Sequence, residues 1–349
     1  MVDSAFKFQF DGTPVKCEQF GDGHINKSYK VETDCGRLYV LQKINSVAFH
    51  DVPGLMANAI AVCEHITRKG GFALHFIKAL SGEYYHVDGD GEYWRSYEFV
   101  NDSVALQSPR NPEDFYLSAV AFGEFQNLLN DFPADTLVET IPNFHNTPDR
   151  YKKFHDVLER DPVGRAAGVK EEIDFYLQRE SEAGRLVAML ESGELPLRVT
   201  HNDTKINNVL FNDTTFKPIC VIDLDTVMPG LSAYDFGDSI RFGASTAAED
   251  EKDLSKVSMD LELFRMYARG FIGSCPKLTD NERSVLALGS KLMTLECGMR
   301  FLADYIDGDN YFSISREEHN LDRARTHIKL VSDMESKWDE MEKIIAEES

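Results

Sequence analysis

Apolar and polar residues alternate in short runs over the first hundred residues, and Gly, Asp and Asn separate the runs. Alternation with a period of two is typical of half-buried β-strands, and the separating residues favour turns. One helical pattern interrupts them at about Val52 to Lys69, with Pro53 in its first turn and Gly70-Gly71 at its end. We therefore predict an antiparallel sheet with one helix laid against it. Its strands are expected at Phe8–Phe10, Val15–Phe20, Ser28–Glu32, Leu38–Ile44, Glu83–Val87 and Tyr93–Val100.

Helical periodicity dominates after residue 100, so the chain is predicted to be an α+β protein with a change of character at about residues 98–101. We expect an N-terminal lobe of residues 1–100 and a C-terminal lobe of residues 101–349. Thr279 and Glu282 have the spacing of a capping box. The predicted helices are Asn111–Asn130, Thr147–Arg160, Val169–Glu191, Thr279–Tyr305 and Arg316–Glu347.

The stretch 199–225 carries most of the candidate chemistry. Two apolar runs, 209–211 and 219–222, flank Asn-Asp-Thr-Thr, which predicts a β-hairpin. Asp223 follows the second run directly, and Asp225 comes two residues later. Four polar residues precede the first run, namely His201, Asp203, Lys205 and Asn208. The hairpin should therefore bring Asp203 and Asn208 close to Asp223.

This spacing predicts phosphoryl transfer, because such a site needs a carboxylate beside the acceptor hydroxyl and oxygen ligands for a metal. We assign catalytic roles to Asp203, as the base, and Lys205. Asn208, Asp223 and Asp225 are the candidate ligands, and hard oxygen ligands suit Mg²⁺. The alternative is a hairpin whose polar residues only cap turns, because a short motif also arises by chance.

Two further sequence features concern a nucleotide. Gly21 and Gly23 flank one residue between two predicted strands, which lets backbone amides approach a phosphate, although a plain glycine turn is the alternative. Kinase-like sheets carry a lysine on the third strand. Gln42 holds that position here, and Lys43 should point to the opposite face, with Glu64 as its obvious partner. Backbone groups of the predicted linker, at Glu98 and Val100, could bond an adenine ring.

The formal net charge of −22 argues against nucleic acid or an anionic membrane as the main partner. No apolar segment after Met1 predicts export, and no run approaches the length of a membrane span. The six cysteines are scattered without C-x-x-C pairs, which favours reduced thiols. We therefore expect a cytoplasmic protein that acts as a monomer.

A polar stripe on the predicted helix 279–305 consists of Glu296, Arg300 and Asp304. A ladder of ion pairs facing water is one interpretation. The helix is apolar elsewhere, however, so we expect it to be buried and the stripe to face a polar substrate pocket. Asp235 and Asp238, in contrast, are expected to cap a helix and hold the catalytic loop.

Taken together, five stretches resemble the aminoglycoside-phosphotransferase-like kinases, and more closely those members that phosphorylate N-acetylhexosamines. The stretches are GDGHIN (21–26), RVTHNDTKINN (198–208), VIDLDTVMPG (221–230), DFGDSIRFGAS (235–245) and ECGMRFLADY (296–305). The resemblance runs over nearly the whole chain. It implies a two-lobed protein-kinase-like fold that binds ATP between the lobes, uses Mg²⁺, and phosphorylates the anomeric hydroxyl of N-acetylglucosamine or N-acetylgalactosamine.

The resemblance also implies which residues surround the sugar. Besides Asp203, these are His24, Asn26, Phe242, Arg300 and Tyr311. Two rival functions remain at this stage. A kinase for choline, homoserine or an aminoglycoside would share Asp203 and Asp223 without these sugar-facing residues, and a non-catalytic nucleotide-binding module would account for the missing lysine.

Overall fold

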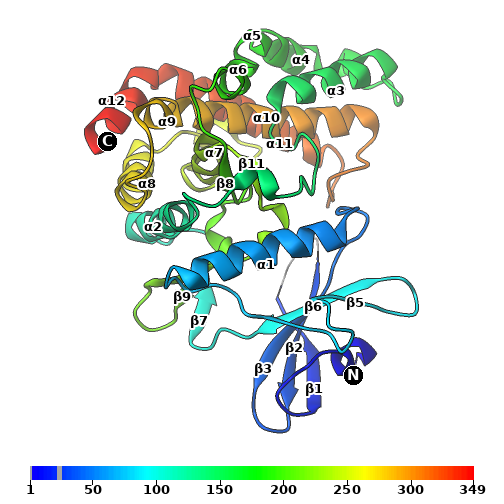
Figure 1. Ribbon diagram of the computed structural model, residues 1–349. Coiled ribbons are helices and arrows are strands. Elements are labelled where there is room, and N and C mark those ends of the chain that lie inside the picture. Colours follow the sequence, from blue (N-terminus) through cyan, green and yellow to red (C-terminus); the bar gives the residue numbers. More distant parts are fainter. Residues whose placement is uncertain (1, 22–25) are drawn as a thin grey trace.

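The computed structural model describes residues 2–21 and 26–349, which form two lobes (Figure 1). The sheet of the N-terminal lobe has the antiparallel order β1-β2-β3-β6-β4, and β5 pairs with β6. The strands are β1 (Pro14–Gln19), β2 (Lys27–Thr33), β3 (Leu38–Lys43), β4 (Phe76–Ile77), β5 (His86–Val87) and β6 (Tyr93–Glu98). Helix α1 (Val52–Arg68) lies between this sheet and the C-terminal lobe. The predicted α+β, two-lobed fold is confirmed.

Two of the predicted strands are wrong in extent. Phe8–Phe10 is not a strand, because Phe8 forms only an isolated bridge with Ala79 after the 3₁₀ helix at Asp3–Lys7. The strand predicted at Glu83–Val87 shrinks to His86–Val87. The prediction of α1 succeeds because its first turn carries clear signals: Asp51 accepts a hydrogen bond from the Gly54 amide, and Pro53 needs no partner for its nitrogen.

The C-terminal lobe is mostly helical (Figure 1). Its helices are α2 (Pro112–Leu128), α3 (Thr147–Arg160), α4 (Lys170–Leu177), α5 (Glu180–Ala183), α6 (Arg185–Glu191), α7 (Ser232–Gly243), α8 (Leu261–Ser274), α9 (Asp280–Ser284), α10 (Leu286–Asp307), α11 (His319–Ser336) and α12 (Trp338–Glu348). The capping box of Thr279 and Glu282 is confirmed at the start of α9.

Three helices predicted as continuous are broken. The 169–191 segment divides into α4, α5 and α6, with Gly184, a poor helix former, between the last two. Val285 separates α9 from α10, and Lys337 separates α11 from α12, both with φ of −108° and ψ well away from helical values. Apolar periodicity continues across such breaks, so the pattern alone does not reveal them.

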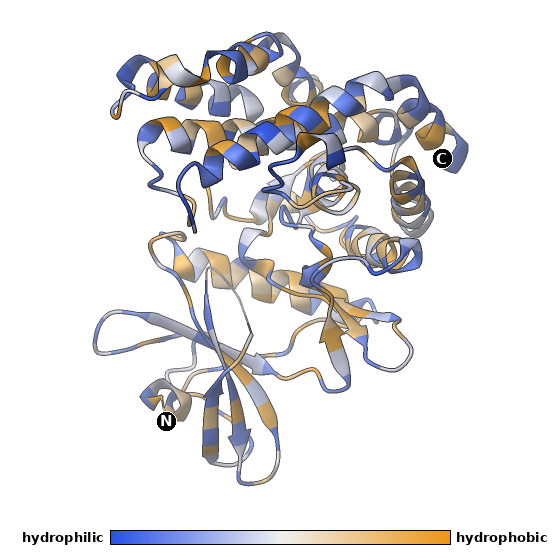
Figure 2. Ribbon diagram, turned by 180° about the vertical axis from the view of Figure 1, so that it is seen from behind, coloured by the Kyte–Doolittle hydropathy of each residue, from blue (hydrophilic) through white to orange (hydrophobic). Residues whose placement is uncertain are grey.

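The predicted hairpin forms where the lobes meet. Strands β9 (Val209–Asn212) and β10 (Pro218–Val221) pair antiparallel, and β7 (Ser103–Ala105), which follows the linker, pairs with β9. Strands β8 (Arg198–Thr200) and β11 (Met228–Gly230) pair on either side of it in sequence. The ribbon of α1 and of this hairpin is mostly hydrophobic (Figure 2), as the junction of two lobes requires.

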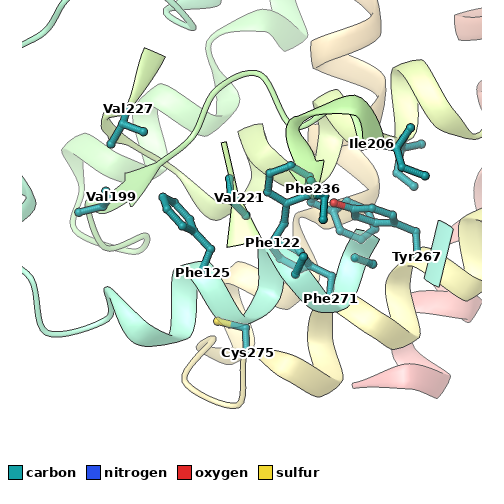
Figure 3. Close-up of a cluster of buried hydrophobic side chains, with 14 of the residues drawn as sticks. Phe122, Phe125, Val199, Ile206, Val221, Val227, Phe236, Tyr267, Phe271 and Cys275 are labelled. Carbon is teal, nitrogen blue, oxygen red and sulfur yellow. The ribbon is translucent and has the colours of Figure 1, made fainter. Parts of the chain in front are cut away.

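A cluster of buried apolar side chains packs the hairpin against α2, α7 and α8 (Figure 3). It contains Phe122 and Phe125 of α2, Val199, Val221, Phe236 of α7 and Phe271 of α8. The rings of Phe236 and Phe271 pack edge to face with their centroids 5.5 Å apart. Fully buried aromatic side chains contribute strongly to stability, so the hairpin and α7 rest on a rigid base. Within the described chain, no helix has the length and apolar character needed to cross a bilayer.

Candidate active site

The loop between β8 and β9 carries the predicted catalytic residues, and α7 holds it in place. The carboxylate of Asp235 accepts hydrogen bonds from the backbone N–H groups of His201 (3.0 Å) and Asn202 (2.8 Å). The Asp238 carboxylate accepts one from the Thr204 N–H at 3.0 Å. Both aspartates are buried, which strengthens these bonds. The prediction that Asp235 and Asp238 hold the catalytic loop is confirmed, whereas the prediction that they cap a helix is wrong, because both lie within α7, whose N-cap is Leu231.

Asp203 lies at the centre of this loop with its carboxylate partly exposed. Lys205 Nζ is 2.9 Å from its Oδ1, and Asn208 Nδ2 donates to its Oδ2 at 3.0 Å. Desolvation raises the pKa of Asp203, but the charge and the hydrogen bond of Lys205, together with the charge of Arg241, hold the pKa below the usual value. Asp203 is therefore ionised at neutral pH and reachable by an acceptor, as a general base must be.

Asp223 follows β10 and adopts a left-handed backbone conformation, with φ of 60°. Its exposed carboxylate forms no hydrogen bond with any residue that the structure describes. The surrounding protein removes part of the solvent from this carboxylate, and this partial desolvation, together with the negative charges of Asp225 and Asp203, raises its pKa. A carboxylate crowded by like charges, with the side-chain oxygen of Asn208 close to the same loop, is a fitting donor set for a divalent cation. These residues would hold Mg²⁺.

Asp225 has different surroundings from Asp223, although we predicted both as ligands. Its Oδ1 is paired with the Arg95 guanidinium of β6, and its Oδ2 accepts a hydrogen bond from Asn26 Nδ2 at 2.6 Å. All three side chains are buried. Both oxygens of Asp225 therefore already have donors from the N-terminal lobe. Asn26, predicted to contact the sugar, is occupied in the same network.

On the third strand, β3, Gln42 lies at the position expected from the sequence and bonds to residues of both neighbouring strands. Its Nε2 donates to Ser28 Oγ at 2.9 Å, and its Oε1 accepts from Arg95 Nε at 2.9 Å. Lys43 points elsewhere and pairs with Glu92 at 2.9 Å. The expected pairing of Lys43 with Glu64 is wrong, because Glu64 is exposed on α1.

The predicted nucleotide contacts stay predictions. Gly21 has φ of +77°, a conformation that favours glycine, whereas Gly23 and His24 lie outside the described residues. At the linker, the Glu98 N–H donates to the His75 carbonyl at 2.9 Å, and the Val100 carbonyl accepts from Ser103 Oγ at 2.7 Å. Those two backbone groups are therefore engaged within the protein.

Arg300 of α10 lies among three aromatic rings. Its guanidinium carbon is 5.4 Å from the ring centroid of Phe144, 5.7 Å from Tyr311 and 5.4 Å from Phe312. Arg300 forms no ion pair or hydrogen bond within residues 2–21 and 26–349. Arg300 and Tyr311 line a cavity of about 180 Å³. A charged donor fork framed by aromatic rings suits a hydroxyl-rich ligand.

Phe242 lines a different cavity, of about 570 Å³, which also contacts Arg241, Glu249 and His327. The ring centroid of Phe242 is 5.8 Å from Lys205 Nζ, so this cavity adjoins the catalytic loop. The structure therefore divides the predicted sugar-facing residues between two cavities.

The other members of the polar stripe on α10 have internal partners. Glu296 is buried and contacts His145 Nδ1 (2.9 Å) and Thr147 Oγ1 (2.8 Å). Asp304 accepts hydrogen bonds from the backbone N–H groups of residues 310–312, at 2.8–2.9 Å, and so shapes the segment that carries Tyr311. Glu296 therefore does not face this cavity, contrary to the expectation, whereas Asp304 lines the cavity beside Arg300 with both carboxylate oxygens bonded within the protein.

The sequence interpretation missed Arg95, Phe144 and His145. The signal for Arg95 was a charged residue inside an aromatic, β-rich run, because a buried arginine requires an anionic partner. Nothing in the local pattern around Phe144 and His145 links them to α10, which lies about 150 residues further along the chain.

A second group with metal-ligand chemistry consists of Glu249, Cys297 and His327, whose ligand atoms lie within 4.8 Å of one another. Arg241 already donates to Glu249 at 2.7 Å, and it also pairs with Asp238 at 2.8 Å. Because the guanidinium supplies the positive charge at this place, we assign no metal to the group.

His327 is buried in this group and gives a pH-dependent prediction. Its Nδ1 donates to the Arg323 carbonyl at 2.8 Å, while Glu249, Arg241 and Asp238 face the ring. Burial lowers its pKa from 6.5 to about 4. Above pH 6.5 the ring is neutral in both folded and unfolded chains. As the pH falls toward 4, only the unfolded chain gains the proton, so stability is lost.

Urea unfolding at pH 7.0 and pH 4.5 tests this. We expect the wild type to lose about 2–3 kcal/mol more than His327→Gln between these pH values. Equal losses in the two proteins would contradict the assignment of a neutral, buried His327.

The comparisons with known proteins agree with this geometry. The phosphotransferase enzyme family, APH, matches residues 16–260. Amicoumacin kinase hAmiN, solved with AMP-PNP and Ca²⁺, has a TM-score of 0.62 at 12% identity, covering 96% of this chain and 91% of that one. Spectinomycin phosphotransferase APH(9)-Ia, with ADP and spectinomycin, has 0.60 at 12%, covering 95% and 96%. Plasmodium vivax ethanolamine kinase has 0.58 at 16%, covering 89% and 82%.

At these identities the solved structures show the fold alone. The family match, in contrast, extends over more than half of the chain and contains the catalytic loop, the hairpin and α7. The chain belongs to the phosphotransferase enzyme family.

Proposed function

We propose that this protein is an ATP-dependent N-acetylhexosamine 1-kinase, which phosphorylates the anomeric hydroxyl of N-acetylglucosamine or N-acetylgalactosamine. One observation carries the kinase part of this proposal. Asp203 is ionised and partly exposed, it is held by Lys205 and Asn208, and it lies close to Asp223, whose carboxylate has no partner in the described chain. A base beside a set of oxygen donors that suits a divalent cation is the arrangement that phosphoryl transfer requires.

The reaction then follows from these residues. The anomeric oxygen attacks the γ-phosphorus of ATP, the bond from that phosphorus to the β-phosphate oxygen breaks, and ADP leaves. Asp203 accepts the proton of the sugar hydroxyl as the new bond forms. Lys205 keeps Asp203 ionised and adds positive charge beside the transferred group. Mg²⁺, when bound at Asp223 and Asn208, neutralises phosphate charge.

The acceptor part of the proposal rests on Arg300 and on the resemblance of five sequence stretches. Arg300 is partly exposed, has no partner among the described residues, and lies among aromatic rings on a mostly buried helix, so its donors are available to a ligand. Sugars present hydroxyl groups to such donors and apolar ring faces to aromatic side chains. The cavity of about 180 Å³ beside Arg300 is lined by residues of α3 and α10 and by Tyr311 and Phe312.

ADP release with a panel of acceptors tests the proposed function. The panel contains N-acetylglucosamine, N-acetylgalactosamine, choline, homoserine and kanamycin, each with ATP and Mg²⁺. We expect turnover only with the two N-acetylhexosamines, and a product whose phosphorus is coupled to the anomeric proton in NMR. Turnover with choline, homoserine or kanamycin alone would assign another kinase activity. Binding of ATP without turnover of any acceptor would indicate a nucleotide-binding module.

Arg300→Ala should impair use of the sugar and spare ATP. Loss of a charged donor to the sugar is expected to lower kcat/KM for N-acetylglucosamine by about 100-fold, or about 2.7 kcal/mol. The KM for ATP should stay within about threefold of the wild-type value. Steady-state kinetics with each substrate varied in turn measure both.

Arg265→Ala provides a matched control, because Arg265 is a surface arginine of α8 that pairs with Glu347. This control should keep wild-type kinetics. Unchanged sugar kinetics in Arg300→Ala, or phosphate on the 6-hydroxyl of the product, would contradict the proposed acceptor site.

A further inference from the structure

Arg95 is a buried cation in the N-terminal lobe that the mechanism above does not use. It is 2% exposed, on β6, directly opposite Gln42 of β3 in the sheet register. Directly opposed residues on antiparallel strands share a face, and their Cα atoms are about 4.5–5.5 Å apart. Arg95 therefore occupies the same face and the same row of the sheet as the position at which kinase-like sheets carry a lysine.

The two side chains are in contact, as well as in register. Arg95 Nε donates to Gln42 Oε1 at 2.9 Å, and Gln42 donates in turn to Ser28 of β2 at 2.9 Å. A row of polar groups thus crosses β2, β3 and β6 and ends at the guanidinium. The lysine that does lie on β3, Lys43, is on the other face and pairs with Glu92.

The guanidinium is fixed from the opposite lobe. Its Nη1 pairs with Asp225, which lies in the turn Leu224–Thr226 that follows the hairpin of the C-terminal lobe. The remaining nitrogen, Nη2, donates to no residue within the described ranges. Two nitrogens of Arg95 are therefore held rigidly, and a third carries donors that are not satisfied by the protein.

The charges around Asp223 indicate which kind of ligand Nη2 of Arg95 can bind. Three carboxylates, Asp203, Asp223 and Asp225, lie near two cations, Lys205 and Arg95, as their mutual electrostatic effects show. The chain as a whole has a net charge of −22. A nucleotide triphosphate adds further negative charge at this place, and Arg95 is a permanent cation with planar donors that match phosphate oxygens.

We propose that Arg95, on strand β6, binds the nucleotide phosphates in place of the lysine that kinase-like sheets carry on their third strand. Asp225 positions Arg95 across the two lobes. This inference rests on the proposed ATP-dependent function. In this arrangement the cation, Arg95, and its carboxylate partner, Asp225, belong to different lobes. Glu64 of α1 is exposed and takes no part in the pairing. The free donors of Arg95 Nη2 would bond a phosphate oxygen of ATP.

Removing the positive charge from β6, and then restoring it on β3, tests the proposal. Arg95→Gln should lower kcat/KM for ATP by about 10–100-fold, the loss expected for a charge-assisted hydrogen bond. The KM for the sugar at saturating ATP should stay within about threefold, which a merely structural defect would not predict. In Gln42→Lys with Arg95→Gln, the cation returns to β3 on the same face. We expect this double variant to recover at least about tenfold in kcat/KM for ATP.

Lys43→Gln is the matched control, because Lys43 neighbours Gln42 but faces away and pairs near the surface. It should keep wild-type ATP kinetics. Arg95→Gln leaves Asp225 unpaired, so it could fail to fold. The double variant keeps a cation beside Asp225, and Arg95→Lys keeps the charge in place. If Arg95→Gln does not fold, these two variants carry the test. Their kcat/KM for ATP is expected to stay within about tenfold of the wild-type value.

The outcomes separate this inference from the proposed function. If the wild-type protein neither binds ATP with Mg²⁺ in calorimetry nor releases ADP with any acceptor, the proposed function and this inference both fail. If the wild type is active and Arg95→Gln keeps kcat/KM for ATP within about threefold, only the role of Arg95 is overturned. A loss in Arg95→Gln with no recovery in the double variant would likewise overturn it and leave Arg95 a structural residue.

Discussion

Asp203→Asn is expected to lower kcat by about 10²–10⁴-fold, because the amide cannot accept the proton of the attacking hydroxyl. The substitution keeps the size of the side chain and its bond from Asn208, so the loop should keep its conformation. Lys205 loses its ionic partner but is partly exposed, so solvent can replace it. ADP release measures turnover, and calorimetry should show ATP bound with nearly wild-type affinity.

Asp213→Asn is a suitable control for Asp203→Asn. Asp213 lies in the exposed turn of the same hairpin, between β9 and β10, and within the described ranges its side chain has a hydrogen bond only from Thr214. Normal turnover is expected for this control. If Asp203→Asn also turned over at nearly the wild-type rate, Asp203 would have no place in the mechanism.

Asp223→Ala should abolish turnover at any practical Mg²⁺ concentration, with a loss of at least about 10³-fold. The reason is that Asp223 is the carboxylate without a partner in the described chain and thus the main candidate to bind the metal. Alanine is less favourable than aspartate in the left-handed backbone conformation of residue 223, but the loss of like-charge repulsion acts in the opposite direction and is expected to be the larger effect. Removing one of three neighbouring carboxylates relieves their repulsion, so without Mg²⁺ the melting temperature of the variant should equal or exceed that of the wild type.

Asp225→Ala distinguishes the two aspartates. This change leaves the Arg95 charge buried and unpaired, which typically costs about 3–5 kcal/mol, so a marked fall in melting temperature is expected. A protein that loses activity through Asp225→Ala without any loss of stability, while Asp223→Ala stays active, would mean that the metal binds at Asp225.

The fold was predictable where sequence signals are local. The limits of α1 follow from a cap and a proline within its first turn, and β9 and β10 follow from two apolar runs around a turn. The helical segment 169–191 was not predictable as three pieces. Its apolar periodicity continues past Gly184, so the pattern of apolar residues does not mark the breaks.

The same contrast holds for the site. Asp203, Asn208 and Asp223 lie within about twenty residues, so one hairpin brings them together and the sequence predicts the cluster. Arg95 and Asp225 are separated by 130 positions. Their pairing depends on the strand register of one lobe and on how the other lobe meets it, and no local pattern encodes either.

The hydrogen bonds of Asp304 have a consequence for how new specificities arise. One carboxylate on α10 accepts hydrogen bonds from the backbone of residues 310–312 and so shapes the segment that presents Tyr311. The catalytic loop is fastened separately, by Asp235 and Asp238 of α7. The sequence and length of the Tyr311 segment can therefore diverge while Asp304 remains, and the phosphoryl-transfer chemistry stays intact. Because the two regions are held separately, acceptor specificity can change during evolution without changes to the catalytic loop.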